Sequence, residues 1–189
     1  MEAVWNRIES WLQTHAPKIF DCLQPGVSEQ QIQETEAFLG VTLPADVKDS
    51  YRLHNGQQLS GPSFIDGWDL LSLDEIQSNW LVWKQLLERG DFHGITSEPS
   101  GPILSDWWNP RWIPFTQDGI GNHFCLDLSP APGGSVGQII LLIHDDVERV
   151  VLAPSFESWL SGIADDLETG KYYYEEQGNY ATLLRDDVA

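Results

Sequence analysis

The chain has 189 residues, 41% of them hydrophobic, which is enough apolar material to pack one domain without a disulfide or a metal. It carries 10 Lys and Arg against 29 Asp and Glu, so its formal net charge is −19. A protein with that charge is repelled by nucleic acids and by anionic membranes, both of which bind basic surfaces. The longest apolar run, Ile139–Ile143, is far too short to span a bilayer.

The N-terminal stretch predicts an amphipathic helix, not a secretory signal. Glu2 stands where a signal peptide carries basic residues. Trp5, Ile8 and Leu12 then recur at helical spacing, and Pro17 ends the pattern.

Cys22 and Cys125 are the only cysteines of the chain. Such a pair, without a secretory signal, is typical of buried free thiols in a reducing compartment. The sequence therefore predicts a cytoplasmic protein with no structural disulfide.

The clearest local pattern predicts a helix from about Glu29 to Leu39. Ser28 is placed as its N-cap, and Gln31, three residues later, completes a capping box. Gly40 supplies the left-handed residue that ends such a helix.

A third helix is expected from Pro44 through His54. The dipeptide Asn55-Gly56 stops it, because both residues tolerate positive φ. A short strand near Trp68 to Leu71 follows. Ser72 and Glu75 then form a second capping box, and the helix that they open ends near Gly90.

The middle of the chain predicts a surface loop and then a series of strands. Residues 91–110 are rich in Gly, Pro, Ser and Asp, which is typical of a long loop. Residues 111–144 hold two acidic residues and one basic residue, so we expect them to form the interior sheet. The strands, of which the last two are expected to pair as a hairpin, are Trp112–Thr116, Asn122–Leu128, Gln138–His144 and Val147–Ala153.

The C-terminal part predicts one more helix and an acidic segment. Ser155 caps the helix, Phe156 and Trp159 belong to its buried side, and Gly170 ends it. Residues 172–176, Tyr-Tyr-Tyr-Glu-Glu, follow. The sequence leaves open whether this segment docks on the domain or stays free to meet a basic partner.

This order of elements predicts the α+β fold class. Helices come first, then strands linked by hairpins, then a helix, whereas a doubly wound parallel sheet alternates strand and helix. We expect residues 1–24 to be an N-terminal helical extension, residues 25–172 to form one α+β domain, and residues 173–189 to be an acidic C-terminal tail.

Four blocks of the sequence, in their order and spacing, resemble the SUKH superfamily, the fungal cell-wall-synthesis regulators and their many bacterial relatives. The resemblance runs from about residue 25 to Tyr172. The blocks are Ser28–Gly40 with Leu43-Pro44 and Asn55-Gly56; Leu70–Ile76; Trp112–Phe115 with Gly119–Asn122 and Cys125–Leu128; and Gly137–Ile139 with His144-Asp145, Ser155-Phe156 and Trp159-Leu160.

The resemblance implies a fold and a kind of function. The implied fold is a curved, largely antiparallel β-sheet with helices packed against it. Family members are understood as binding proteins: many bacterial ones look like immunity proteins that neutralise a toxin domain, often a nuclease or deaminase. The fungal branch serves in cell-wall and stress signalling. The resemblance brings no catalytic residues with it.

No residue pattern in the sequence demands a cofactor or catalysis. Gly119–Asn122 lacks the third Gly and the following helix of a dinucleotide fingerprint, so we expect a turn between strands. His123, Cys125 and Asp127 alternate along one strand and share a face, and with His144 they make a metal site conceivable. A polar face bonded to neighbouring groups is the favoured interpretation. We predict no metal site, no cofactor and no catalytic residue.

The expected contacts with a partner lie in three segments. Trp107-Trp108 stands in a loop, where an exposed Trp is a preferred interface anchor. The alternative is that one ring covers the core. With the acidic turn after the apolar strand and the acidic C-terminal segment, the predicted partner-binding residues are Asp91, Asp106, Trp107, Trp108, Asp145, Asp146, Glu175 and Glu176.

Three functional hypotheses follow. The favoured one is an immunity-type inhibitor whose acidic surface occupies the basic cleft of a nuclease-like toxin domain, which needs that cleft to hold phosphates. The second is a cytoplasmic regulator or scaffold linked to cell-wall synthesis. The third, an enzyme or small-ligand binder, has no site in the sequence to support it. An acidic surface also confers solubility, so the charge by itself does not decide that a partner exists.

Overall fold

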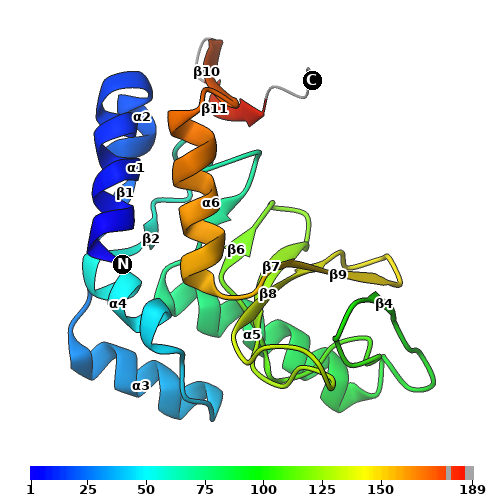
Figure 1. Ribbon diagram of the computed structural model, residues 1–189. Helices are drawn as coiled ribbons and strands as arrows, with labels where there is room; N and C mark the ends of the chain where they lie inside the picture. The colour runs from blue at the N-terminus through cyan, green and yellow to red at the C-terminus, as the bar shows by residue number, and fades with distance from the viewer. Residues whose placement is uncertain (178–179, 186–189) are drawn as a thin grey trace.

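The computed structural model describes residues 1–177 and 180–185 of the chain. Figure 1 shows its helices and strands. The helices are α1 Glu2–His15, α2 Pro17–Phe20, α3 Glu29–Leu39, α4 Ala45–Leu53, α5 Leu73–Arg89 and α6 Phe156–Glu168. The strands are β1 Leu23–Pro25, β2 His54–Gln57, β3 Asp69–Leu70, β4 Glu98–Ser100, β5 Trp112–Pro114, β6 Thr116–Gln117, β7 His123–Asp127, β8 Gln138–Leu142, β9 Glu148–Ala153, β10 Tyr172–Gln177 and β11 Tyr180–Arg185.

A five-stranded sheet organises the fold, with strand order β4-β9-β8-β7-β5. All its pairs are antiparallel except β4 with β9, which is parallel. Two-stranded pairs, β1-β2, β3-β6 and β10-β11, lie around it. The predicted α+β class and the largely antiparallel sheet are confirmed. Within the described ranges, no helix combines the length and the apolar character needed to cross a bilayer.

The capped helices begin and end where the sequence predicts. At α3, the Gln31 N–H donates to Ser28 Oγ (3.3 Å) and the Ser28 N–H donates to Gln31 Oε1 (3.0 Å). Gly40 ends this helix in the left-handed conformation, with φ of 68°. The same reciprocal bonds join Ser72 and Glu75 at the start of α5. These local patterns are sufficient to predict the helix ends from the sequence, because every hydrogen-bonding group in them lies within a few residues of the helix end.

The end of α4 differs from the prediction. The helix stops at Leu53, and His54 already has the extended conformation, with φ of −136° and ψ of 127°. His54 begins β2, which pairs with β1. The prediction that the helix continues through His54 is therefore wrong, because pairing with a distant strand takes this residue out of the helix.

The predicted loop 91–110 contains a strand that the sequence does not announce. Glu98–Ser100 forms β4 beside β9, and the Glu98 N–H donates to the Val147 carbonyl at 2.7 Å. The expected strand Trp112–Thr116 is divided into β5 and β6, which pair with different neighbours. In both cases the partner strand, not the local sequence, sets the conformation.

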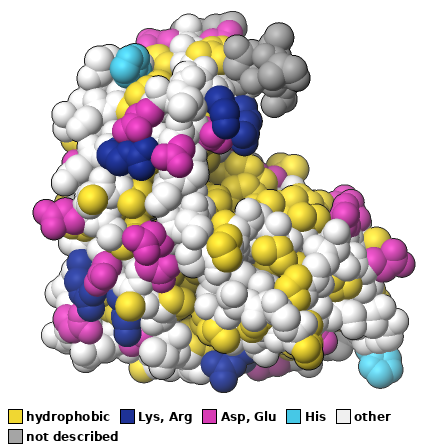
Figure 2. All heavy atoms as spheres, viewed as in Figure 1, with side chains coloured by type: hydrophobic (Ala, Val, Ile, Leu, Met, Phe, Trp, Pro, Cys, Tyr) yellow, Lys and Arg dark blue, Asp and Glu magenta, His cyan; other side chains and the backbone are white. Residues whose placement is uncertain are grey.

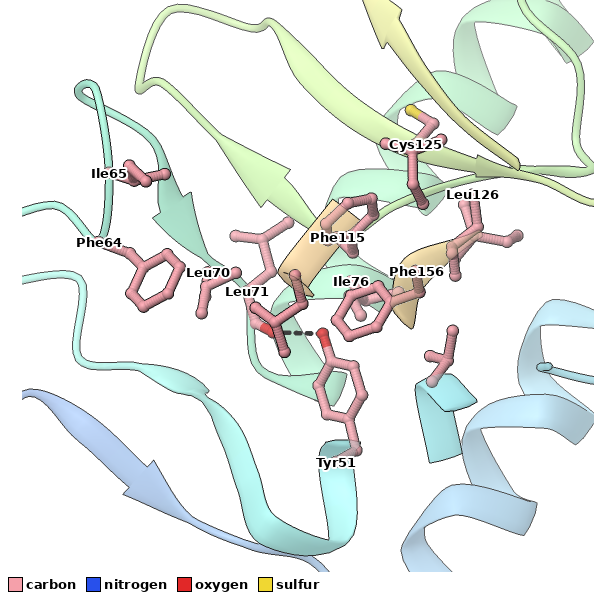
Figure 3. Close-up of a cluster of buried hydrophobic side chains, with 14 of the residues drawn as sticks. Tyr51, Phe64, Ile65, Leu70, Leu71, Ile76, Phe115, Cys125, Leu126 and Phe156 are labelled. Atoms are coloured by element: carbon pink, nitrogen blue, oxygen red, sulfur yellow. Dashed lines mark hydrogen bonds between the residues drawn. The ribbon is translucent and has the colours of Figure 1, made fainter. Parts of the chain in front are cut away.

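One apolar core joins the helices to the sheet. Figure 3 shows a part of it, in which the Tyr51 hydroxyl donates to the Leu71 carbonyl at 2.8 Å. Cys125 belongs to this core, and both cysteines are buried and free, as predicted. The residues of α1 belong to the same core: Trp5 is buried and its indole N–H donates to Ser50 Oγ at 2.8 Å. The N-terminal helix is thus packed on the domain.

Strands β10 and β11 form a hairpin at the C-terminal end of α6 (Figure 1). The hairpin docks on the loop that precedes β3, since the Asp66 N–H donates to the Leu183 carbonyl at 3.1 Å. The segment Tyr172–Glu176, whose state the sequence left open, is therefore part of a docked strand pair. Residues 178–179 and 186–189 of the expected tail lie outside the described residues.

Candidate functional site

The two faces of the sheet are covered by different helices. Along β7, His123 contacts the ring of Trp83 on α5, whereas its neighbour Phe124 contacts the ring of Trp159 on α6. Successive side chains of a strand point to opposite faces, so α5 and α6 lie on opposite sides of the sheet. A hollow is left beside each helix.

The hollow beside α6, which we call the α6 groove, is the candidate functional site. It has a volume of about 320 Å³. Figure 2 shows apolar side chains exposed in the depression between the lobe that carries α6 and the sheet. The groove is lined by Ile65, Asp66, Trp68, Phe124, Leu152, Ala153, Ser158, Trp159, Gly162, Ile163, Asp166, Tyr172 and Arg185.

Aromatic rings form a continuous wall of the α6 groove. The ring centroids of Trp68 and Phe124 are 4.1 Å apart, and those of Phe124 and Trp159 are 6.1 Å apart in an edge-to-face arrangement. These three residues come from the loop before β3, from β7 and from α6. Such partly exposed rings offer a large apolar area at a small entropic cost, which is the property of an interface anchor.

The mouth of the groove is polar and is held by the C-terminal hairpin. The Tyr172 hydroxyl donates to Asp66 Oδ2 at 2.7 Å, and the Arg185 N–H donates to Asp66 Oδ1 at 3.1 Å. Arg185 also pairs with Asp166 at 3.0 Å. Burial, together with the bond to Asp66, raises the pKa of Tyr172 above its ordinary value. Asp66 has a φ of 49°, a strained conformation for a residue other than Gly, and these bonds hold it there.

Among the residues that line the groove, Ser158 is the only one with an aliphatic hydroxyl, and none is a histidine or cysteine. The Ser158 hydroxyl accepts a hydrogen bond from Ser155 at the start of α6. A nucleophile with an adjacent base is therefore missing from this lining. What the groove offers is an apolar wall with hydrogen-bonding groups at its mouth, which suits the binding of a side chain or peptide segment.

The predicted contact residues of the loop 91–110 and of the Asp145-Asp146 turn lie side by side. Arg149 joins them: its Nη1 donates to the Asp146 carbonyl (2.6 Å) and its Nη2 to the Trp107 carbonyl (2.9 Å). The guanidinium also lies 5.1 Å from the centre of the Trp107 ring. Sequence reasoning grouped these segments as one surface but did not find Arg149, which is fully buried.

The two adjacent tryptophans have different environments. Trp108 is 2% exposed and its ring stacks on Trp83, so it belongs to the core. Trp107 is half-buried and reaches the surface. Of the pair, only Trp107 presents area to a partner, because one ring covers the core.

The remaining predicted contact residues are distributed over the molecule. Asp106 accepts a hydrogen bond from Asn109 at 2.6 Å, and Asp91 pairs with Arg89. Glu175 and Glu176 lie on β10, and Glu176 pairs with Lys18 at 2.5 Å. Figure 1 places this hairpin above α6, away from β4 and the far end of β9. The acidic residues therefore form two surfaces, not one.

The histidines that made a metal site conceivable have other partners. His123 is buried and its Nδ1–H donates to the Thr116 carbonyl at 2.8 Å. His144 Nδ1 bonds to Asn122 Oδ1 at 2.9 Å. In the part of the chain that the structure describes, no three His, Cys, Asp or Glu residues are grouped closely enough to hold a metal ion. The turn Gly119–Asn122 is organised by Asp118, whose Oδ1 accepts from the Ile120 and Asn122 N–H groups.

His123 makes the stability of the fold depend on pH. Burial lowers its pKa below the ordinary value, although the Thr116 carbonyl and Asp118 oppose that effect and His144 adds to it. The unfolded chain therefore binds a proton more readily than the folded one, and stability falls as the pH falls below about 6.5. One such proton changes the free energy of unfolding by at most about 1.4 kcal/mol per pH unit.

We expect His123→Gln to reduce the loss of stability between pH 7 and pH 5. Gln is a polar side chain of similar size that takes up no proton in this range. Urea unfolding at several pH values measures the effect. His93→Gln, a change at an exposed histidine, is the control and should leave the pH dependence as it is in the unmodified chain. An unchanged slope in His123→Gln would contradict the assignment.

Sequence reasoning missed the α6 groove. The sequence pattern places Trp159 on the buried side of its helix and Trp68 in a short strand, and neither position indicates a binding surface. The bond from Arg185 to Asp66 spans 119 positions of the chain, and no local pattern signals such a pairing. The exposed Gly162 in the middle of α6 is the one feature that could have pointed to it, since a Gly inside a helix costs stability and often marks a close approach or a ligand.

Comparison with known proteins identifies the family. The model of the SMI1/KNR4 family (SUKH-1) matches residues 26–162. The cell wall biosynthesis/cell cycle regulator smi1 of Schizosaccharomyces pombe is 29% identical, over 95% of this chain and 38% of its own length. The glucan synthesis regulatory protein of Neurospora crassa is 28% identical, over 95% of this chain and 40% of its own. The cell wall assembly regulator SMI1 of Saccharomyces cerevisiae is 26% identical, over 89% and 41%. The chain thus spans well under half the length of these relatives, and it belongs to the SMI1/KNR4 (SUKH-1) family.

Proposed function

We propose that this chain is a non-catalytic regulatory domain linked to cell-wall synthesis, and that it acts by binding a partner protein in the α6 groove. The observation that carries the proposal is the groove itself, an aromatic wall open to solvent with a fixed polar mouth. An exposed apolar surface that the fold maintains with ordered polar groups at its edge is typical of a binding site.

The names of the relatives support the regulatory part of the proposal. They describe regulators of cell-wall biosynthesis, cell-wall assembly and glucan synthesis. This chain corresponds to about two fifths of each of those proteins. The link to cell-wall synthesis is therefore the part of the proposal that needs a test in cells.

Gly162 allows that test without damage to the fold. It lines the groove in the middle of α6, and a Cβ added there meets no atom within 4 Å. Gly162→Ala should stabilise α6 by about 0.5–1 kcal/mol and leave the groove open. Gly162→Trp places a large side chain at the edge of the groove and should block a partner. The two variants change the same position and differ in how much of the groove they fill.

The experiment replaces the gene in the organism that encodes the chain. We expect loss of the gene to sensitise cells to an agent that damages the cell wall. Gly162→Ala should restore resistance and Gly162→Trp should not, while thermal unfolding shows both purified variants to be folded. Equal restoration by both variants would contradict the groove as the binding site. Normal resistance after loss of the gene would contradict the link to the cell wall.

Immunity against a toxin is a second candidate function, favoured by the net charge of −19. A protein with this charge can occupy the basic cleft of a nuclease-like toxin domain. Co-expression with a toxin encoded beside this gene should then protect the cell, and association should slow markedly as salt rises above physiological strength. If the chain protects against none of the toxins that are encoded beside its gene, this candidate function is ruled out.

A further inference from the structure

A second hollow lies on the opposite face of the sheet, beside α5. It has a volume of about 290 Å³ and shares no lining residue with the α6 groove. We call it the α5 pocket. It is lined by Asn79, Val82, Trp83, Leu86, Phe92, Trp107, Gly121, His123 and His144.

Aromatic and aliphatic side chains make the α5 pocket a place for an apolar group. The ring centroid of Trp83 lies 5.8 Å from that of Phe92 and 6.3 Å from that of His123. Val82, in the middle of α5, is 58% exposed and so presents apolar area to water at the edge of the pocket. An apolar side chain that enters the pocket would remove these surfaces from water, which favours binding.

Acidic residues stand next to several lining residues in the chain, and we call these segments the rim of the pocket. Asp91 and Asp106 precede the lining residues Phe92 and Trp107 in the chain, and Asp145 follows His144, with its side chain 74% exposed. Asp118 binds the N–H groups on both sides of Gly121.

The cations near this rim are already engaged. Arg89 pairs with Asp91, and Lys84 lies 4.9 Å above the ring of Trp80. The guanidinium of Arg149 is buried against Trp107. Asp91 offsets Arg89 and Glu88 offsets Lys84. Asp106, Asp118 and Asp145 then leave negative charge in excess over Arg149 in these segments.

We propose that the α5 pocket binds a basic segment of a partner protein, with one apolar side chain in the pocket and Lys or Arg residues on either side of it. The lining selects the apolar anchor, and the acidic rim selects the flanking charges. An acidic segment would be repelled by the rim and by the net charge of −19. Because the pocket and the α6 groove lie on opposite faces of the sheet, the domain can hold two partners at once. This inference stands whether or not the α6 groove has the role given above.

Three short peptides test the proposal in an NMR titration of the full chain. The first has a central Phe between two Lys on each side; the second has Ser in place of Phe; the third has Glu in place of each Lys. We expect the first to bind roughly tenfold or more tightly than either of the others, since each loses the anchor or the charges. Its binding should shift the signals of Val82, Gly121 and His144, and should weaken as salt screens the exposed rim.

Two variants of α5 give the matched comparison. Val82→Lys introduces a charge at the edge of the pocket, whereas Leu81→Lys introduces the same charge at an exposed neighbour that does not line it. We expect Val82→Lys to weaken the Phe peptide roughly tenfold and Leu81→Lys to have a much smaller effect. Gly162→Trp should leave this binding unchanged.

Three outcomes would overturn the proposal. Equal binding of the Phe and Ser peptides would mean that the acidic surface alone attracts them. Equal effects of Val82→Lys and Leu81→Lys would mean that the pocket is not the site. Signal shifts at Trp159 and Gly162 in place of Val82 and Gly121 would assign the peptide to the α6 groove.

Discussion

Replacing Gly56 with Ala is expected to destabilise the fold by about 3 kcal/mol or more. Gly56 has a φ of 65°, and a Cβ added there would overlap the main chain of Leu71 and lie 2.6 Å from the Ser72 nitrogen. These main-chain atoms begin the capped helix α5, so they cannot move aside without disturbing it. The Asn55-Gly56 pair, which resembles a family hallmark in the sequence, is thus a point where two backbones meet.

Gly40→Ala separates this overlap from simple backbone strain. Gly40 has a similar φ, 68°, but a Cβ there meets no atom within 4 Å. We expect Gly40→Ala to cost only the left-handed strain, about 1–2 kcal/mol. Urea unfolding of both variants measures the difference. If both lose the same stability, the approach of Leu71 to Gly56 is not what requires the glycine.

Replacing Arg149 with Ala is expected to have an effect of similar size, about 3 kcal/mol or more. The side chain is 0% exposed, and its hydrogen bonds go to the main-chain carbonyls of Asp146, Glu148 and Trp107. Without the guanidinium these carbonyls lose a charged donor, and a hydrogen bond to a charged group is worth about 1.5–3 kcal/mol. The segment around Trp107 would also lose its side-chain bond to β9, while the pairing of β4 with β9 remains.

Two further substitutions test that role of Arg149. Arg111→Ala removes an exposed Arg and should change stability by about 0.5 kcal/mol or less. Arg149→Lys should recover only part of the loss, because one ammonium does not reproduce the planar fork that reaches several carbonyls. Urea unfolding gives the stabilities, and the signals of Trp107 report whether the loop is detached. A stable Arg149→Ala protein with an unchanged loop would contradict the assignment.

The acidic surface and the two hollows have different origins in the chain. The charge of −19 is a property of composition and was evident from the sequence. Arg149 attaches the loop 91–110 to the Asp145-Asp146 turn, and the sequence did not indicate that attachment. Whether any of the predicted residues contacts a partner stays a prediction.

The sequence by itself determined the elements whose signals are local. The capping boxes at Ser28 and Ser72 and the left-handed Gly40 and Gly90 placed two helices, because the groups that satisfy a helix end lie within four residues of it. The alternation along β7 predicted that His123 and Cys125 share a face, since the period of a strand is fixed. The order of helices and hairpins gave the α+β class.

Only the tertiary structure decided the features that depend on distant partners. Strand β4 exists because β9 lies beside it, and His54 leaves its helix because β1 does. The α6 groove forms where Asp66 meets Arg185. Burial likewise separated Trp107 from Trp108, although the two rings are adjacent in the chain. Conformation follows local chemistry where all the bonding groups are neighbours in sequence, and it follows packing where they are not.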